Sequence, residues 1–240
     1  MINRFIRHMQ PLHVATPDVI GFRCQFSLAD YQPQMMQMLP PSAQPGQQAV
    51  AKRQAEFLAG RLCARTCLEK LGTQQTWISI GSHRSPCWPE GIRGSITHTD
   101  QNALCICSAS PSIVALGIDL EQHLSPDTAD DIAAQVLTRE EQVLLSGQKL
   151  DTALFVTRVF SAKEAIFKAL YPYVQAYFGF EAVSLRCIEG EYLGFVLNKN
   201  LHPDYQRGQS LWVQSLNENT HILSLLIQSR SHKATSGVFI

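Results

Sequence analysis

Apolar residues recur with helical spacing in two long segments of this 240-residue chain. The first segment covers roughly residues 47–71, and Gly72 directly after it is a natural C-terminal stop. Its buried face is marked by residues at steps of four, three and four: Ala51, Ala55, Leu58 and Leu62. A shorter helix is predicted where Thr138 is followed three residues later by Glu141, because this spacing is typical of a capping box.

The second long segment covers roughly residues 151–170. Its apolar stripe consists of residues three or four apart: Phe155, Val159, Ala162, Ile166 and Ala169. A polar stripe lies about 200° around the helix axis, and its members are Thr157, Ser161, Glu164 and Lys168. Lys163 falls outside the polar stripe, between Phe160 and Phe167. The pattern therefore predicts a long amphipathic helix in which one lysine, Lys163, lies outside the polar stripe.

Runs of alternating or continuous apolar residues predict strands around both helices. Residues 102–109 and 112–122 are joined through the Ser-Pro-Ser segment at residues 110–112 and predict a β-hairpin. Four more strands follow the second helix, as two hairpins with turns near Gly190 and Glu218: residues 183–188, 192–198, 210–216 and 221–228. Each half thus combines one long helix with mainly antiparallel strands. This predicts an α+β fold of two halves, although no sequence repeat is visible.

The overall charge excludes several classes of partner. Lys and Arg number 20 and Asp and Glu number 20, so the formal net charge is zero. Bulk nucleic-acid binding and membrane-surface binding need a basic excess, and we expect neither. No apolar run approaches the eighteen or so residues of a membrane helix, and the N-terminus has no signal-peptide core. Any positively charged site must therefore be local.

The cysteine pattern bears on the redox compartment of the protein and does not indicate a metal site. Seven cysteines are scattered along the chain, an odd count that predicts free thiols in a reducing cytoplasm. Zinc sites usually show CxxC or HxxxH spacings, and the sequence has neither. The pairs Cys63/Cys67 and Cys105/Cys107 are therefore interpreted as buried structural cysteines.

Two carboxylates share one side of the predicted strand "LGIDLEQ". Leu116, Ile118 and Leu120 face one side of the strand, and Gly117, Asp119 and Glu121 face the other. Alternate residues of a strand lie about 7 Å apart at their backbones, so the two carboxylates repel unless a cation or proton lies between them. The alternative is a solvated edge-strand face.

The stretch "FSAKEAIFKAL" adds a third carboxylate and two lysines. Taken alone, Glu164 and Lys168 form an i,i+4 pair on a solvated helix face, worth a few tenths of a kcal/mol. Taken with Asp119 and Glu121, Glu164 completes an oxygen set of the kind that Mg²⁺ prefers, and Lys163 and Lys168 can hold phosphate oxygens beside it. His98 and the arginines of the first helix are further sources of positive charge.

These stretches together resemble the signatures of Sfp-type 4'-phosphopantetheinyl transferases. The first signature is matched by Gly117, Ile118, Asp119 and Glu121, and the second by Phe160, Ser161, Lys163, Glu164, Ala165 and Lys168. "KRQAEFLAGRLCARTCLEKLG" and "PCWPEGIRGSITHTD" precede them in the order expected of the family. The likeness covers about residues 50–170 and is greatest to the enterobactin synthase component D subgroup.

The resemblance implies a fold and a reaction. Members of the family are monomers of two similar α/β halves with pseudo-twofold symmetry, which here implies residues 1–116 on the CoA 3'-phosphate side and 117–240 on the magnesium and pyrophosphate side. They transfer the 4'-phosphopantetheine arm of coenzyme A to a serine of an apo acyl or peptidyl carrier protein and release adenosine 3',5'-bisphosphate. The acceptor serine belongs to the carrier, so no internal nucleophile is expected.

The resemblance also implies roles for individual residues. Asp119, Glu121 and Glu164 would bind Mg²⁺. Lys168, with Lys163, would bind the pyrophosphate. The CoA 3'-phosphate and nucleotide would be held by residues of the first half: Arg53, Arg61, Thr97 and His98. Glu164 and Lys168 are the catalytic candidates, and whether Glu164 accepts the serine proton or only binds metal stays open.

Some positions depart from the family pattern, and other functions compete. Phe160 stands where many relatives have Trp, and the loop 81–91 has His83 and Arg84 where close relatives tend to carry lysines, so its CoA contacts are open. The competing hypotheses are another Mg²⁺-dependent phosphoryl or nucleotidyl transferase, without a P-loop or kinase signature, and a non-catalytic carrier or CoA binder. Which carrier and pathway the protein serves is not encoded in any short motif.

Overall fold

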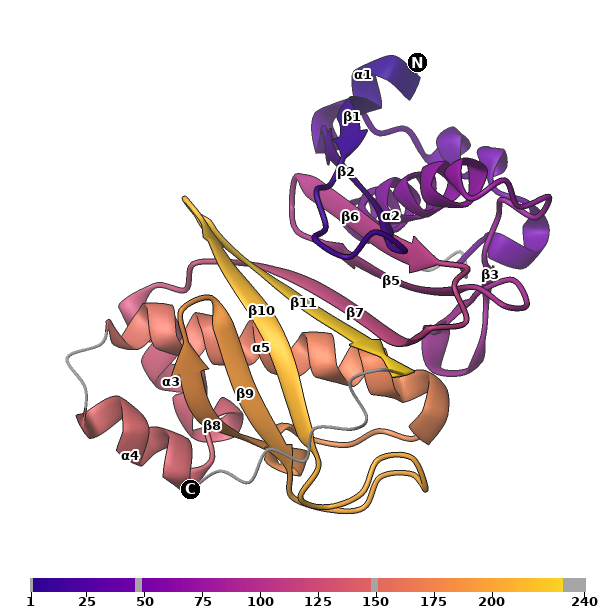
Figure 1. Ribbon diagram of the computed structural model, residues 1–240. Coiled ribbons are helices and arrows are strands. Elements are labelled where there is room, and N and C mark those ends of the chain that lie inside the picture. Colours follow the sequence, from indigo (N-terminus) through magenta and orange to yellow (C-terminus); the bar gives the residue numbers. More distant parts are fainter. Residues whose placement is uncertain (1, 46–48, 148–150, 231–240) are drawn as a thin grey trace. The chain divides into compact units, whose positions relative to one another are not determined.

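The computed structural model describes residues 2–45, 49–147 and 151–230 (Figure 1). The chain divides into two compact units, Met1–Leu116 and Gly117–Ile240. Helices and antiparallel strands are present in both units, so the predicted α+β class is confirmed. No helix in the described part of the chain is long and apolar enough to cross a membrane.

The first unit is a four-stranded antiparallel sheet covered by one long helix. The strands lie in the order β1-β2-β6-β5. Their bounds are β1 (Ile6–Pro11), β2 (Ile20–Phe26), β5 (Arg93–His98) and β6 (Asn102–Ser108), and the helix is α2 (Ala51–Lys70). The smaller elements are α1 (Ile2–Phe5), η1 (Leu28–Asp30), η2 (Pro33–Met38), η3 (Pro41–Ala43), β3 (Ser79–Ile80), η4 (Ser82–Arg84) and β4 (Pro86–Cys87).

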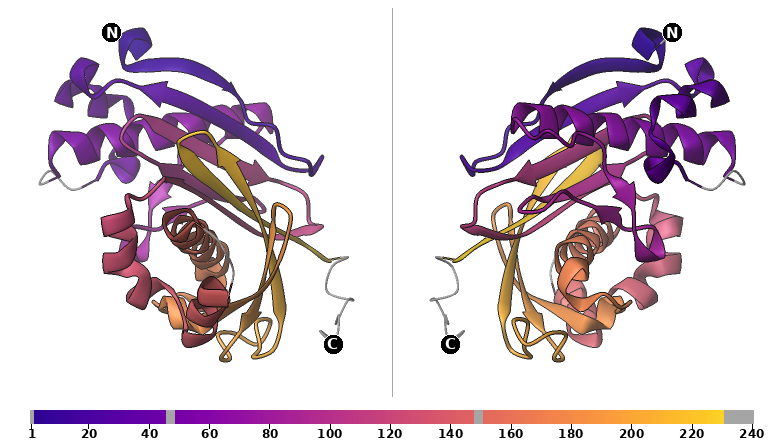
Figure 2. Two further views of the ribbon diagram at one scale, coloured as in Figure 1. Left: turned by 90° about the vertical axis from the view of Figure 1, so that its left-hand side faces the viewer. Right: turned by 90° about the vertical axis from the view of Figure 1, so that its right-hand side faces the viewer.

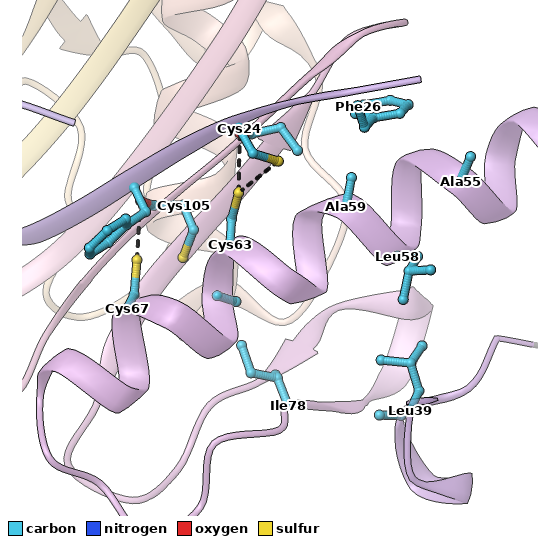
Figure 3. Packing of buried hydrophobic residues seen from close by; sticks show 14 of the residues in the cluster. Cys24, Phe26, Leu39, Ala55, Leu58, Ala59, Cys63, Cys67, Ile78 and Cys105 are labelled. Atoms are coloured by element: carbon cyan, nitrogen blue, oxygen red, sulfur yellow. Dashed lines mark hydrogen bonds between the residues drawn. The ribbon is translucent and has the colours of Figure 1, made fainter. Parts of the chain in front are cut away.

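The buried face of α2 packs on β2, β5 and β6. Of the four residues predicted to mark this face, Ala55 and Leu58 lie in the core, Leu62 is partly buried against it, and Ala51 is exposed. Cysteines fill the space between helix and sheet (Figure 3). Cys63 Sγ lies 3.4 Å from Cys24 Sγ, and Cys67 Sγ lies 3.5 Å from the carbonyl oxygen of Cys105. All seven cysteines are free, and five of them are buried, as expected for structural thiols.

A glycine sets how closely α2 approaches β5. A Cβ atom on Gly60 would lie 2.9 Å from Ile96 Cγ2, which is closer than real Cβ contacts come. The missing side chain therefore lets α2 and β5 touch at this level. The next residue on the same side of β5 is His98, so the close contact also brings His98 near the first turns of α2.

The second unit is a five-stranded sheet with three helices. The strands lie in the order β7-β11-β10-β9-β8. Their bounds are β7 (Ile113–Gln122), β8 (Val183–Glu189), β9 (Tyr192–Leu197), β10 (Ser210–Glu218) and β11 (His221–Ser229). The helices are α3 (Pro126–Val136), α4 (Arg139–Gly147) and α5 (Thr152–Val174), with the single turn η5 (Phe180–Ala182) before β8.

Helix α5 is the central element of the second unit. It lies between the sheet and α3, as Figure 2 shows in views close to its axis. Its whole predicted apolar stripe is buried: Phe155, Val159, Ala162, Ile166 and Ala169. Asp151 caps its N-terminus by accepting a hydrogen bond from the Leu154 N–H. The two polar residues Thr157 and Ser161 are also fully buried, so the predicted polar stripe is solvated over only part of its length.

Two of the predicted element boundaries and one pairing need correction. The first helix begins at Ala51, and residues 47 and 48 of its predicted range lie outside the described part of the chain. The second helix continues four residues beyond the predicted end, to Val174. The predicted hairpin of residues 102–109 and 112–122 is wrong, because β6 pairs with β2 and β5 whereas β7 joins the other sheet beside β11.

The later hairpins are confirmed. Strand β8 pairs with β9 up to Glu189 opposite Tyr192, which leaves a two-residue turn containing Gly190 at φ +61°. Strand β10 pairs with β11 up to Glu218 opposite His221. Short antiparallel connections of this kind are predictable because both strands and their turn are contiguous in the sequence. The tail beyond residue 230 lies outside the described residues.

Candidate active site

Asp119 lies in a buried part of β7. Its side chain is only about 3% exposed, while the neighbouring Ile118 and Leu120 are fully buried. A solvated edge-strand face would leave this carboxylate in water, so that interpretation is wrong for Asp119. A buried carboxylate needs a cationic partner, and Asp119 has one in Lys168 of α5, whose Nζ lies 2.7 Å from Oδ1.

Gly117 makes this pairing possible by allowing β7 to lie against α5. A Cβ atom on Gly117 would lie 1.9 Å from the carbonyl oxygen of Ala165 and 3.0 Å from Ala169 Cβ. Only glycine fits at this separation. Since Asp119 is two residues further along the same strand, the close approach also brings its carboxylate to the helix turn that carries Lys168.

We expect Gly117→Ala to push β7 away from α5. The added methyl group meets backbone, so the variant should lose about 3 kcal/mol or more of unfolding free energy and most of its activity. Gly190→Ala is the control: its φ of +61° costs roughly 1 kcal/mol, but the added Cβ meets no atom within 4 Å. Urea unfolding of both variants measures the difference, and equal small losses would contradict the close approach.

Glu121 and Glu164 are close enough to Asp119 and Lys168 to be affected by their charges, and the four residues form one cluster. Burial and then the neighbouring charge of Asp119 raise the pKa of Glu164 above its usual range. Burial, with Asp119 and Glu164 nearby, raises the pKa of Glu121 to about 8. Lys168 opposes both shifts without abolishing them. Raised pKa values mean that these carboxyl groups tend to bind protons, and a divalent cation can take the place of such protons. The site therefore favours a further cation.

The donor set fits a hard divalent cation. Carboxylate oxygens are the ligands that Mg²⁺ prefers, and three carboxylates lie within reach of one another's charge. In the conformation of the described residues, however, no three His, Cys, Asp or Glu side chains are arranged as a metal centre. Asp119 Oδ1 is bound to the Lys168 amine in this conformation, so metal binding requires side-chain rearrangement.

Lys163 is not in this cluster. Its side chain is 1% exposed, and its Nζ lies 2.7 Å from Glu141 Oε2 and 2.8 Å from the Val136 carbonyl oxygen. Burial lowers the pKa of Lys163, and Glu141 opposes this shift. In this conformation Lys163 is not available to bind a pyrophosphate, because its ammonium group is buried and paired with Glu141 within the second unit.

The sequence did not predict the second role of Glu141. As predicted, it closes a capping box, since its Oε2 accepts the Thr138 N–H at 2.7 Å. Its Oε1 also accepts the N–H of Leu185 in β8 at 2.6 Å. With Lys163, this one carboxylate joins the start of α4, strand β8 and helix α5. The capping-box spacing was the only local signal for it, because its other partners are distant in the sequence.

In the first unit, Arg53 and His98 both lie near Glu56. Glu56 Oε2 lies 3.8 Å from His98 Nδ1. Burial raises the pKa of Glu56, and the charges of Lys52 and Arg53 oppose this shift. Arg53 is exposed and the His98 side chain is 33% exposed. Thr97 precedes His98 on β5 and is buried on the other side of the strand. The structure thus brings two of the predicted nucleotide-binding cations together.

Arg61 lies about 12 Å further along the same helix, given the helical rise over eight residues. It is 4% exposed, its guanidinium packs 4.8 Å from the centre of the Phe57 ring, and its Nη1 has no hydrogen-bond partner among the described residues. Burial lowers its pKa to about 10. A buried guanidinium without a carboxylate partner is costly and favours an anionic ligand.

Comparisons with known proteins identify the family. One family model, described as the 4'-phosphopantetheinyl transferase N-terminal domain, matches residues 42–108. Another, described as the 4'-phosphopantetheinyl transferase superfamily, matches residues 115–224. The enterobactin synthase component D of Escherichia coli O157:H7 is 37% identical over 145 residues, which cover 60% of this chain and 68% of the relative. The chain belongs to the 4'-phosphopantetheinyl transferase superfamily, and the family predicted from the motifs is confirmed.

Other relatives are matched over a smaller share of their length. The 4'-phosphopantetheinyl transferase PptT of Mycobacterium tuberculosis is 34% identical over 145 residues, covering 60% of this chain and 62% of the relative. The enterobactin synthase component D of Salmonella typhi is 37% identical over 118 residues, covering 49% of this chain and 48% of the relative. The chain therefore matches about half the length of the Salmonella relative.

Proposed function

We propose that this protein transfers the 4'-phosphopantetheine arm of coenzyme A to a serine hydroxyl of an apo carrier protein and releases adenosine 3',5'-bisphosphate. The observation that carries the proposal is the cluster of Asp119, Glu121, Glu164 and Lys168, in which one lysine lies among three carboxyl groups. It lies within the region matched by the superfamily model, residues 115–224. Such a cluster is suited to a divalent cation and a pyrophosphate.

Each member of the cluster has a role in this proposal. Asp119, Glu121 and Glu164 hold Mg²⁺, which when bound supplies positive charge beside the CoA pyrophosphate. Lys168, whose side chain is 27% exposed, exchanges its contact with Asp119 for a pyrophosphate oxygen and neutralises charge on the leaving phosphate. A second role for Glu164, as the general base, would be to accept the serine proton, directly or through a water. Positioning and electrostatics dominate such a transfer.

The first unit holds the nucleotide in this proposal. Arg53 and His98, which share Glu56, bind the 3'-phosphate end of CoA. The buried Arg61 supplies a second guanidinium in need of an anion. The side chain of Thr97 is buried on the opposite side of β5, and in this proposal it helps to hold the strand that carries His98. Lys163 is left out of the pyrophosphate contacts because of its buried pairing with Glu141.

We expect Arg53→Ala to weaken CoA binding selectively. Loss of one charge-assisted phosphate contact should raise the dissociation constant for CoA by about tenfold or more. The affinity for dephospho-CoA, which lacks the 3'-phosphate, should hardly change. Lys70→Ala, at the other end of α2, is the matched control. Equal losses for both ligands in titration calorimetry would remove Arg53 from the 3'-phosphate site.

The carrier partner is proposed at the level of class. Several relatives bear the name enterobactin synthase component D, so a peptidyl carrier domain of a siderophore synthetase is the first acceptor to test, followed by polyketide and polyunsaturated fatty-acid carriers. We further propose that the protein works in the cytoplasm, where its seven cysteines stay reduced. We also propose that it acts as a monomer, as the family resemblance implies. Light scattering measures the oligomeric state.

A direct assay tests the function. The protein is mixed with CoA, Mg²⁺ and an unmodified carrier domain, and the carrier is weighed by mass spectrometry. The expected result is a mass increase of one phosphopantetheine group that disappears when EDTA is added. No increase on peptidyl, polyketide and fatty-acid carriers, despite measurable CoA binding, would instead identify a non-catalytic binder.

A further inference from the structure

Glu56 is a buried carboxylate in a helix whose other buried residues, apart from Arg61, are apolar or small. It lies in the second turn of α2 and is 7% exposed. The apolar surroundings raise its pKa. A carboxylate in such a place is destabilising unless a cation compensates it, so the identity of its partner indicates why it is there.

Three cations lie around Glu56, and they are not equivalent. Lys52 Nζ is 4.0 Å from Glu56 Oε1, but it is 2.7 Å from Asp100 Oδ1 and its side chain is 52% exposed. Arg53 contributes only through its charge. His98 Nδ1 is 3.8 Å from Glu56 Oε2 and comes from a different element, β5. Asp100 holds Lys52 more closely than Glu56 does, and His98 is the cation that reaches Glu56 from a different element.

The geometry of α2 and β5 fixes this pairing. The two elements touch where Gly60 meets Ile96. Two residues along the strand from Ile96 to His98 advance about 6.6 Å. Four residues back along the helix from Gly60 to Glu56 advance about 6 Å. The two advances are nearly equal, so Glu56 lies opposite His98 just as Gly60 lies opposite Ile96.

We propose that Glu56 is a positioning residue for His98: its carboxylate accepts the Nδ1–H of the imidazole, keeps the ring charged, and leaves Nε2–H as the donor to a phosphate of the nucleotide. The inference rests on the proposed function for the identity of the ligand. The separation of 3.8 Å closes to a hydrogen bond when the phosphate fixes the ring. A carboxylate behind a histidine is a general way to fix both its tautomer and its charge.

The first test needs no ligand. In ¹⁵N-histidine NMR spectra of the whole protein, neutral His98 should carry its proton on Nδ1, and its pKa should lie above the usual value of about 6.5. The charged groups that face the pair are Lys52, Arg53 and Asp100, and the effect of Glu56 is separated from theirs by substitution. Glu56→Gln should lower the pKa of His98 by about one unit.

Glu69→Gln makes the same chemical change on the same helix, at an exposed pair with Arg65, and should leave the His98 titration unchanged. An unprotonated Nδ1 in the wild type, or equal titrations in wild type and Glu56→Gln, would overturn the proposal. The wild-type tautomer decides the matter even if Glu56→Gln fails to fold.

The second test follows the ligand. Affinity for adenosine 3',5'-bisphosphate should fall in the wild type as the pH rises through the pKa of His98, because the imidazolium loses its charge. In Glu56→Gln this fall should begin about one pH unit lower, so the variant binds roughly threefold more weakly midway between the two pKa values. A loss equal at every pH would indicate a structural role and overturn the proposal.

The two tests also separate this inference from the function on which it rests. If His98 shows the expected tautomer and titration but His98→Asn binds the bisphosphate as tightly as the wild type, the pairing stands and the nucleotide-binding role of His98 fails. If the titration fails while binding still depends on His98, the proposed function stands and the role of Glu56 fails.

Discussion

Glu164→Gln should lower the rate of phosphopantetheine transfer by roughly a hundredfold or more while the fold remains intact. Glutamine keeps the shape of the side chain but cannot hold a divalent cation as a carboxylate does or accept a proton. Glu164 belongs to a cluster in which one lysine, Lys168, lies among three carboxyl groups. Replacing this carboxylate therefore removes one of the oxygen ligands that the cluster offers to a divalent cation.

The same substitution should not destabilise the protein. A carboxyl group whose pKa is raised in the folded state destabilises the fold at pH values above that pKa, and the effect vanishes as the pH falls below the unfolded value. At neutral pH without metal, Glu164→Gln should thus melt at the same temperature as the wild type or a higher one. Opposite effects on activity and stability are typical of a functional site.

The measurement is the initial rate of carrier modification as a function of Mg²⁺ concentration, with melting temperatures recorded on the same samples. Glu189→Gln, an exposed acid on β8, is the control and should behave as the wild type in both. Near-full activity of Glu164→Gln with an unchanged Mg²⁺ dependence would falsify the assignment of Glu164 to the metal site.

The sequence predicted those features that depend on local periodicity. The apolar stripe of α5 follows from residues three and four apart, and the side shared by Gly117, Asp119 and Glu121 follows from strand alternation. The capping box at Thr138 is likewise a local pattern. In each case the relevant residues are neighbours along the chain, so their relative directions are fixed by backbone geometry alone.

Features that depend on distant partners were not predictable. Strand β7 looks like the second arm of a hairpin with β6, yet its partner is β11, about a hundred residues further on. Lys163 lies next to Glu164 in the sequence, but one helical residue corresponds to a turn of about 100°, which directs the two side chains to different surroundings. Only the packing of α4 and β8 provides Glu141 as its partner.

Lys163→Met should be the most destabilising of the charge-removing variants, with a loss of about 3–5 kcal/mol in unfolding free energy. The methionine fills the space, but Glu141 is left as an unpaired carboxylate that is 0% exposed. Adding Glu141→Gln should restore part of the loss, because the amide is uncharged and its oxygen can still accept one backbone N–H. The restoration should be incomplete, since Thr138 and Leu185 both donate to Glu141 and one glutamine oxygen serves only one of them well.

Urea unfolding of the two single variants and the double variant measures this coupling. Lys199→Met is the matched control, because Lys199 pairs with Glu181 at 2.9 Å with side chains 46% and 69% exposed. An exposed pair of this kind contributes less than about 1 kcal/mol, so burial rather than distance should account for the difference. The competing outcome is a Lys163→Met variant of unchanged stability that binds CoA more weakly. In that case Lys163 leaves Glu141 to reach the pyrophosphate, as the family resemblance implied.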